Sequence, residues 1–322
     1  MARLIIHGGR RLGGTYRPTG NKNAALPMLA ASVMTDEPVR LDNLPLIEDV
    51  FTMLFLLQDL GADVELKGHS VTICARGLRK TRLSAELCER VRSSILFAGP
   101  LAARHGKAVL FPPGGDVIGR RRLDTHFEGL RQLGITVSGN GRYVFSRRRL
   151  RGARILLDEA SVTATENIVM AAVLAEGPTS IFNAACEPHV QDLCKMLNHM
   201  GARISGIGTN LLHIDGVSSL HGVRHRVGPD YIDAASFIAA AVLTGGELTL
   251  EGIEPDPFNI LARPLRKLGV DWRIEPDALK LSSRQKLRVR NDYGSAIPKI
   301  EDGIWPNFPS DLMSVAIVLA TQ

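Results

Sequence analysis

The sequence predicts an α/β protein of two domains, built from a repeated unit of about 70 residues. Two observations support this prediction. The chain has 322 residues, which is too many for one ordinary hydrophobic core. One sequence pattern recurs four times along it, and a second, Ala-rich pattern alternates with the first. Repetition at this spacing decides the fold class before any single motif does.

The first pattern is a helix that ends at a glycine and leads into a strand. Apolar residues recur at helical spacing, and the glycine suits a left-handed helix end. Alternating residues such as ADVEL then predict a strand, and most copies add a second strand such as SVTIC. The copies read MLFLLQDLGADVEL, FEGLRQLGITVSG, CKMLNHMGARISG and LARPLRKLGVDWRI, with glycines at Gly61, Gly134, Gly201 and Gly269.

The second pattern is a helix that is apolar on nearly every side, as in NAALPMLAASVM and NIVMAAVLAEG. Such a helix is expected to be wholly buried rather than amphipathic. A strand follows each of four copies, so the unit is strand, buried helix, strand, outer helix and two further strands. A fifth copy, PNFPSDLMSVAIVLATQ, reaches Gln322 at its helix, and the repeat predicts that more chain should follow.

Composition limits the class of function. The chain is 45% apolar. Its start has only a four-residue apolar run, far short of a signal-peptide core, and no run approaches the length of a membrane span. The four cysteines form no CxxC pair, which predicts reduced thiols in a cytoplasmic protein. A net charge of +6 favours anionic partners. Aromatic residues are only 5%, which argues against a nucleic-acid stacking surface. The basic run SRRRLRGAR, residues 146–154, is expected to be a solvated linker.

Polar residues recur where each buried helix begins. The segments are GNKN, RVRSS, SVTATEN, PDYIDAAS and PSD. Asn, Ser and Asp cap first turns, but Lys22 and Arg92 cannot cap, and a cation opposes the helix dipole unless an anion lies between them. The pattern therefore predicts a phosphate or carboxylate site where these helix starts meet.

A separate glycine-rich loop carries one carboxylate and three consecutive arginines. It reads LFPPGGDVIGRRRLDTH, from Leu110 to His126. Taken alone, the loop could be a solvated turn, because Gly and Pro punctuate surface loops and charges belong there.

These segments together resemble the UDP-N-acetylglucosamine enolpyruvyltransferases, in order and along the whole chain. The resemblance rests on GNKNAALPMLAA, FPPGGDVIGRRRLDTHFEGLRQLG, SVTATENIVMAAVLAEG, PDYIDAASFIAAA and WPNFPSDLM. It implies a two-domain inside-out α/β barrel with buried helices and outer sheets. Residues 1–21 with 230–322 would form one domain, and 22–229, carrying the loop 111–122, the other, with the substrates between them. Six repeats would need roughly 100 residues more, so the chain is expected to be truncated at its C-terminus.

The resemblance also implies the reaction. The enolpyruvyl group of phosphoenolpyruvate moves to the 3-hydroxyl of UDP-N-acetylglucosamine with release of phosphate, in the first committed step of peptidoglycan synthesis. No metal or organic cofactor is implied, and nucleic acid and membrane are not expected partners.

Four residues take chemical roles by this resemblance. Asp116 stands at the proton-donor position, where many members have Cys. Lys22 resembles the lysine that binds phosphoenolpyruvate, and Arg121 is expected to engage the same substrate. Asp311 resembles the carboxylate that takes the 3-hydroxyl proton, although at a helix start it could be a plain N-cap. Because fosfomycin inhibits the family through the loop cysteine, Asp116 predicts resistance to this drug.

The remaining expected site residues bind substrate. Arg122 stands where Pro is usual in the family, and Glu159 stands where Lys is frequent. Asp230 and Glu187 are left open between a functional and a structural role, and His126 is expected to be structural. The expected sugar-nucleotide and cleft contacts are Asn23, Arg92, Arg121, Arg122, Leu123, Asp124, Ser161, Val162 and Thr163.

Two alternatives remain at this stage. 5-Enolpyruvylshikimate-3-phosphate synthase shares the fold and the chemistry, but the GNKNA start and the PPGGD loop favour the sugar-nucleotide enzymes. A noncatalytic paralogue that senses sugar nucleotide would lose the acid, the base or the lysine, and here Asp116, Asp311 and Lys22 are all retained.

Overall fold

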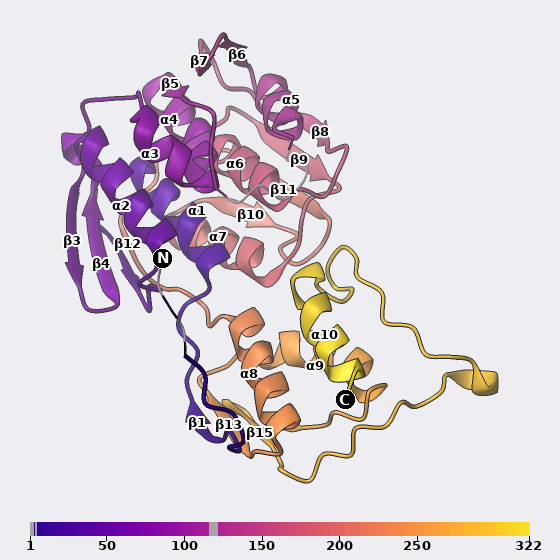
Figure 1. Ribbon diagram of the computed structural model, residues 1–322. Helices are drawn as coiled ribbons and strands as arrows, with labels where there is room; N and C mark the ends of the chain where they lie inside the picture. Colours follow the sequence, from indigo (N-terminus) through magenta and orange to yellow (C-terminus); the bar gives the residue numbers. More distant parts are fainter. Residues whose placement is uncertain (1–2, 4, 116–121) are drawn as a thin grey trace. The chain divides into compact units, whose positions relative to one another are not determined.

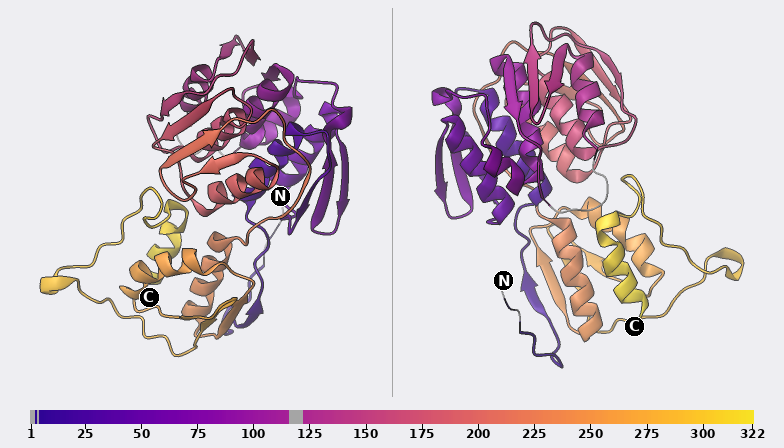
Figure 2. Two further views of the ribbon diagram at one scale, coloured as in Figure 1. Left: turned by 180° about the vertical axis from the view of Figure 1, so that it is seen from behind. Right: turned by 45° about the horizontal axis from the view of Figure 1, so that its top comes forward.

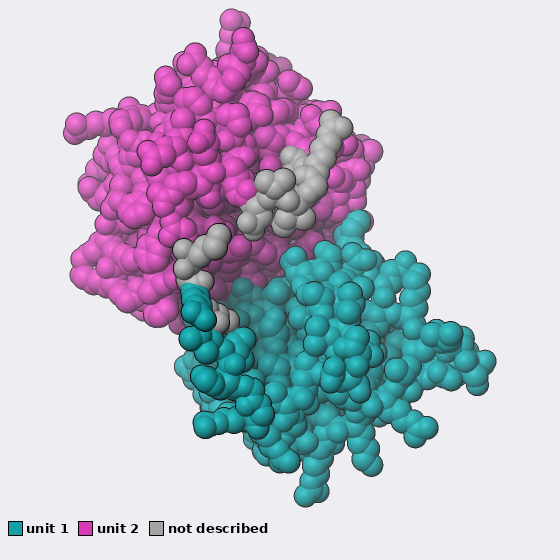
Figure 3. Space-filling view, viewed as in Figure 1, with its two compact units in different colours: residues 1–19, 229–322 teal, residues 20–228 magenta. Residues whose placement is uncertain are grey.

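The computed structural model describes residue 3 and residues 5–115 and 122–322. The chain divides into two compact units, coloured separately in Figure 3. Unit 1 comprises residues 1–19 and 229–322, and unit 2 comprises residues 20–228. The chain therefore passes from one unit to the other twice.

Unit 2 is built around buried helices, as the Ala-rich pattern predicted. The central helices are α1 (Lys22–Ala31), α4 (Ala98–His105) and α6 (Val162–Ala172). Every residue from 24 to 31 and from 164 to 172 is buried, because small alanines let helices pack closely on all sides. The 3₁₀ turn η1 (Ser32–Met34) continues α1, and η3 (Arg92–Phe97) leads into α4 (Figure 1).

Three sheets of unit 2 share one topology. In two of them, a short strand pairs in parallel with the strand that follows a central helix, and two hairpin strands complete the sheet. In the third, the first strand shrinks to a parallel bridge between Arg82 and Val109. The sheets are β12 (Val223–Arg226), β2 (Val39–Asp42), β4 (Ser70–Cys74), β3 (Asp63–Lys67); β8 (Arg154–Leu156), β9 (Pro178–Phe182), β11 (Leu211–Asp215), β10 (Arg203–Ser205); and β5 (Lys107–Leu110), β7 (Tyr143–Arg147), β6 (Ile135–Gly139).

The outer helices end as the repeated glycine predicted. They are α2 (Glu48–Leu60), α5 (Asp124–Gln132) and α7 (Pro188–His199) in unit 2 and α9 (Pro255–Arg266) in unit 1. The following glycines have φ angles of 102°, 89°, 98° and 86°, a left-handed conformation that L side chains rarely adopt. Figure 2 shows these elements from two further directions. The short helix α3 (Ala85–Arg90) and the turn η2 (Ala75–Gly77) complete unit 2.

Unit 1 contains one four-stranded sheet of the same kind. Its order is β1 (Gly14–Tyr16), β13 (Leu248–Glu251), β15 (Ala278–Leu281) and β14 (Arg273–Ile274). Two strands are exchanged between the units. β1 precedes α1 but pairs with β13, whereas β12 precedes the unit 1 helix α8 (Tyr231–Thr244) but pairs with β2. The exchange explains why unit 1 is discontinuous in sequence.

Two predicted buried helices are only partly covered. In α8, Phe237 is 41% exposed, and in α10 (Met313–Ala320) Ile317 is 59% exposed. The expectation of complete burial is wrong for both, because the described residues form one sheet in unit 1 and three in unit 2. The short turns η4 (Tyr293–Ser295) and η5 (Ser310–Leu312) lie between α9 and α10.

The basic run 146–154 is not a linker. Ser146 and Arg147 belong to β7, Arg154 begins β8, and Leu150 between them is 4% exposed. The cysteines are free, and Cys88, Cys186 and Cys194 are buried. No helix in the described part of the chain is long and apolar enough to cross a membrane.

Candidate active site

Lys22 lies at the first residue of α1, where sequence analysis expected a cation to face an anion. Asn21 is the N-cap, and its Oδ1 accepts hydrogen bonds from the backbone N–H groups of Asn23 at 2.8 Å and Ala24 at 3.2 Å. The Lys22 ammonium pairs with Asp49 at 3.2 Å, and its side chain is 46% exposed. The lysine is thus held at the helix start and can still reach a ligand.

The glycine-rich loop approaches this region along α3 and η3. The Gly114 N–H donates to the Cys88 carbonyl at 2.9 Å, and a Cβ at Gly114 would lie 1.7 Å from the Glu89 carbonyl oxygen. Only glycine fits there. Gly115 has a φ of 86° and packs beside Arg92, the first residue of η3. Asp116 and Arg121 follow this anchor and lie outside the described residues.

Arg122 emerges from the other end of the loop. Its Nε donates to Asp124 at 2.7 Å, and a terminal nitrogen lies 3.4 Å from Asp158. The hydrogen bond to Asp124 raises the pKa of Arg122. An Arg92 terminal nitrogen donates to the Arg122 carbonyl at 3.3 Å. The carboxylates of Asp124 and Asp158 therefore hold the Arg122 side chain in place.

Asp124 begins α5, and Leu123 precedes it as the N-cap residue. Leu123 packs its side chain against the core of unit 2. The next residue, Thr125, donates to Asp158 at 2.8 Å and to Glu159 at 3.2 Å. The segment expected at the uridine is therefore tied to the residues just before Ser161.

Ser161 caps the central helix α6. Its Oγ accepts from the backbone N–H of Ala164 at 3.4 Å, and its carbonyl accepts from Thr165 Oγ1 at 2.8 Å. Val162 and Thr163 form the first turn and are partly exposed. A helix start of this kind offers free backbone N–H groups to an anion.

His126 lies beneath this turn and is 2% exposed. Its Nδ1 accepts from the Asn167 amide at 3.1 Å, which places the ring proton on Nε2, and Nε2 donates to Thr163 Oγ1 at 3.2 Å. Burial, reinforced by the charge of Arg92, lowers the pKa of His126 to about 3. The ring is neutral and structural, as expected.

We predict that His126 makes the protein less stable in acid. Its pKa is about 3 in the folded state and about 6.5 in the unfolded chain. The unfolded chain therefore binds the extra proton first, and stability present above pH ~6.5 falls by up to about 1.4 kcal/mol per unit as pH drops toward 3. Urea unfolding of His126→Asn across this range should show a smaller slope, while the exposed-residue control His7→Gln keeps the parent slope. Equal slopes in all three proteins would contradict the assignment.

Glu166 and Glu187 form a buried acidic pair that sequence analysis did not predict. Glu166 Oε1 and Glu187 Oε2 are buried without a hydrogen-bond partner among the described residues. Burial raises the pKa of both carboxyls, and the charge of Glu187 adds to the effect on Glu166. One Glu187 oxygen is thus without a partner, although hydrogen bonds from the backbone of Cys186 and Glu187 to the carboxylate partly offset the rise in its pKa. Asp230, by contrast, caps α8 by accepting from Ile232 at 2.9 Å and Asp233 at 3.1 Å.

Asp311 belongs to unit 1 and is described separately. It lies inside the turn η5, is exposed, and neither caps a helix nor makes a hydrogen bond or ion pair within the described part of the chain. The plain N-cap alternative is therefore wrong for Asp311. Its carboxylate is available to a ligand.

Sequence reasoning missed the acidic partners of the site cations. Asp49 lies in the first turn of α2, and Asp158 lies three residues before Ser161, the N-cap residue of α6. Both positions precede or open helices near predicted cations, which is the signal that could have found them. The described residues contain no group of three or more potential metal ligands.

The fold and this polar helix-start region define a class of protein. The family described as EPSP synthase (3-phosphoshikimate 1-carboxyvinyltransferase) matches residues 6–319. The enolpyruvyl transferase NikO from Streptomyces tendae has a TM-score of 0.75 at 25% identity, over 86% of this chain and 67% of that one. EPSP synthase from Acinetobacter baumannii has the same fold, with a TM-score of 0.72 at 22% identity, over 89% and 68%.

Relatives of higher identity give the particular family. UDP-N-acetylglucosamine 1-carboxyvinyltransferase of Treponema denticola is 51% identical over all of this chain and 76% of its own length. The proteins of the same name from Borreliella burgdorferi and Bradyrhizobium diazoefficiens are 49% and 47% identical, over 76% and 74% of their lengths. The chain belongs to the UDP-N-acetylglucosamine 1-carboxyvinyltransferase family of enolpyruvyl transferases.

Proposed function

We propose that this protein transfers the enolpyruvyl group of phosphoenolpyruvate to the 3-hydroxyl of UDP-N-acetylglucosamine, releasing phosphate, as a UDP-N-acetylglucosamine 1-carboxyvinyltransferase of peptidoglycan synthesis. The observation that carries the proposal is the set of cations at the helix starts of unit 2. Lys22 and Arg92 open α1 and η3, where a phosphate or carboxylate group would neutralise them.

The residue roles are proposed from the chemistry that the reaction needs. C3 of phosphoenolpyruvate gains a proton, the sugar oxygen attacks C2, and its own proton must leave. Asp116 is the proposed acid and Asp311 the proposed base. Loss of phosphate and of one C3 proton then restores the double bond. Lys22 and Arg121 hold the phosphate and carboxylate, stabilising the charge that develops on them.

Sugar-nucleotide binding is proposed for the first turns of α6 and α5. The partly exposed Ser161, Val162 and Thr163 offer backbone N–H groups for the diphosphate. Arg122, Leu123 and Asp124 lie where uridine would bind, and Asp124 and Asp158 hold the Arg122 side chain in place. Asn23 and Arg92 are proposed to contact the substrates from the first residues of α1 and η3.

The architecture and location are proposals of the same kind. Sheets of one topology and buried central helices support a two-domain inside-out α/β barrel, with residues 1–21 and 230–322 in one domain and 22–229 in the other. Free cysteines support a cytoplasmic location, where thiols stay reduced.

Calorimetry with the two candidate acceptors tests the function. We expect the enzyme to bind UDP-N-acetylglucosamine and to release phosphate when phosphoenolpyruvate is added, with no binding of shikimate 3-phosphate. Binding of shikimate 3-phosphate instead would assign the chain to the other enolpyruvyl transferases. Sugar-nucleotide binding without phosphate release would assign it to a noncatalytic sensor.

A further inference from the structure

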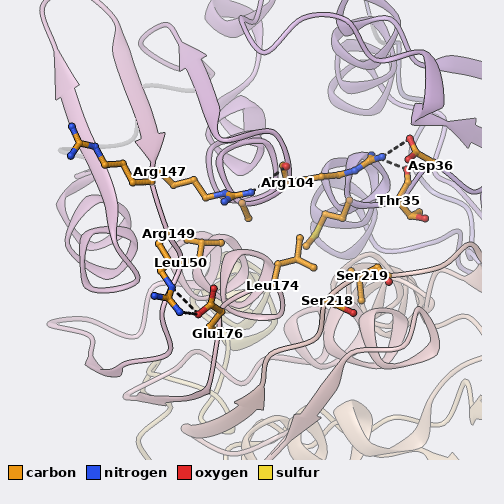
Figure 4. A pocket seen from close by; sticks show the side chains of 14 residues that line it. Thr35, Asp36, Arg104, Arg147, Arg149, Leu150, Leu174, Glu176, Ser218 and Ser219 are labelled. Carbon is orange, nitrogen blue, oxygen red and sulfur yellow. Dashed lines mark hydrogen bonds and ion pairs between the residues drawn. The ribbon is translucent and has the colours of Figure 1, made fainter.

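A second polar cavity lies in unit 2, at the opposite ends of the central helices. It has a volume of about 320 Å³ and is lined by four arginines. Three of them, Arg104, Arg147 and Arg149, are labelled in Figure 4, and the fourth is Arg148. Met34 ends the turn that continues α1, Arg104 lies in the last turn of α4, and Leu174 follows α6. The proposed active-site residues lie at the first residues of α1 and α6, which the helical rise places about 18 Å away. The cavity is therefore a different site.

Two of the arginines have a structural task. Arg104 donates to the carbonyl oxygens of Val33 at 2.6 Å and Thr35 at 2.9 Å, and Arg147 donates to those of Ala102 at 3.0 Å and Arg104 at 3.4 Å. These carbonyls lie at helix ends, where backbone acceptors are short of intrahelical donors, although that of Ala102 also accepts from the Gly106 N–H at 3.0 Å. Each guanidinium carries five N–H groups, so Arg104 and Arg147 both keep N–H donors that these carbonyls do not use.

The lining charges do not balance. Asp36 pairs with Arg104, and Glu176 pairs with Arg149. Arg147 and Arg148 make no ion pair within the described ranges, which leaves two positive charges in excess. The neighbouring His105 is affected as well. Burial lowers the pKa of His105, and the positive charge of Arg104 lowers it further.

Contacts that stabilise the fold do not account for all the positive charge that lines this cavity. Capping of helix ends accounts for Arg104 and Arg147, and the ion pair with Glu176 accounts for Arg149. Arg148 is exposed and makes no hydrogen bond among the described residues, yet it lines the cavity. The hydroxyls of Ser218 and Ser219 add neutral donors on the opposite wall (Figure 4).

We propose that this cavity binds a phosphate dianion carried by a small molecule. Guanidinium groups bind phosphate oxygens through paired, charge-assisted hydrogen bonds, and a dianion would neutralise the excess of two charges. A volume of about 320 Å³ is at the lower end for ligand pockets, which limits the ligand to small phosphates and compact phosphate esters. The side chains of Leu150 and Leu174 give such an ester an aliphatic wall (Figure 4).

Inorganic phosphate, titrated into the purified protein at low salt and followed by calorimetry, is the first probe. We expect a site whose affinity falls about tenfold in Arg148→Ala, the usual loss for one charge-assisted contact, and further in Arg148→Glu. Because Arg148 is exposed and without a partner, neither change should unfold the protein. Enolpyruvyl transfer should keep the parent rate in Arg148→Ala.

Two matched variants locate the binding. Arg142→Ala removes an exposed arginine that lines a separate cavity of about 640 Å³ in the same unit, and Lys22→Ala removes a cation of the proposed active site. We expect both to bind inorganic phosphate at this cavity as the parent does. The proposal is overturned if either weakens binding as much as Arg148→Ala, or if the parent binds nothing at about 10 mM. A parallel titration with glucose 6-phosphate separates an organic ester, which should bind at least as tightly, from inorganic phosphate.

Discussion

Replacing Lys22 by Ala should lower kcat/KM for phosphoenolpyruvate by about 10²- to 10³-fold, the range found when one preorganised charge donor is removed from an active site. The ammonium group sits at the start of α1, where the helix dipole adds to its positive charge. The substitution would also leave Asp49, now 3.2 Å from the ammonium, as an uncompensated negative charge beside the phosphate. Steady-state kinetics at saturating UDP-N-acetylglucosamine measure the effect.

This prediction has an internal test in Asp49. If repulsion by Asp49 contributes to the loss, Asp49→Asn should recover part of the activity in the Lys22→Ala background, and a double-mutant cycle would give a coupling between the two positions. Lys67→Ala, which removes an exposed lysine on β3, should leave both substrates unaffected. Equal weakening of phosphoenolpyruvate and sugar-nucleotide binding by Lys22→Ala would contradict the assigned role.

The repeated elements could be predicted from sequence because local and tertiary preferences agree in them. Gly61, Gly134, Gly201 and Gly269 each end a helix and each adopt a positive φ, a conformation that depends on the glycine itself. The Ala-rich helices of unit 2 are buried because most of their side chains are small and apolar, and even the polar Glu166 and Asn167 of α6 lie inside. In these elements the sequence pattern and the packing environment favour the same structure.

Other features depend on residues far away in the sequence and could not be predicted from the neighbouring residues alone. The pattern of α8 matches that of α1, yet Phe237 is 41% exposed, because burial depends on how many sheets surround the helix. The run 146–154 looked like a solvated linker, but Arg147 donates to carbonyls of α4, some 40 residues earlier. Likewise, the pairing of Arg122 with Asp158 joins residues from α5 and α6 flanks. Such contacts follow from the topology rather than from spacing.

Asp116 is the residue at which this chain departs most usefully from the common family pattern. It follows Gly114 and Gly115, whose contacts with α3 and η3 fix the base of the loop. Asp116→Asn cannot donate a proton, so we expect the rate to fall about 10²- to 10⁴-fold, the range for a positioned acid. Affinity for UDP-N-acetylglucosamine should stay near that of the parent, measured by calorimetry. Asp63→Asn, at an exposed carboxylate on β3, is the matched control and should keep the parent rate.

The same residue should decide the response to fosfomycin. The drug acts on the family when the loop cysteine opens its epoxide, a reaction that requires a strongly nucleophilic thiolate. A carboxylate is a much poorer nucleophile toward an epoxide, so the parent enzyme should keep its activity during prolonged exposure. Asp116→Cys should instead be inactivated and should carry one covalent adduct at residue 116, visible by mass spectrometry of the digested protein. Cys88, Cys186 and Cys194 are buried, and burial raises the pKa of each thiol. The fourth cysteine, Cys74, is partly exposed, so the digest must place the adduct at residue 116 and not at Cys74. Rapid alkylation of the parent at Asp116, or an Asn variant that turns over at the parent rate, would show that this carboxyl is not the acid of the reaction.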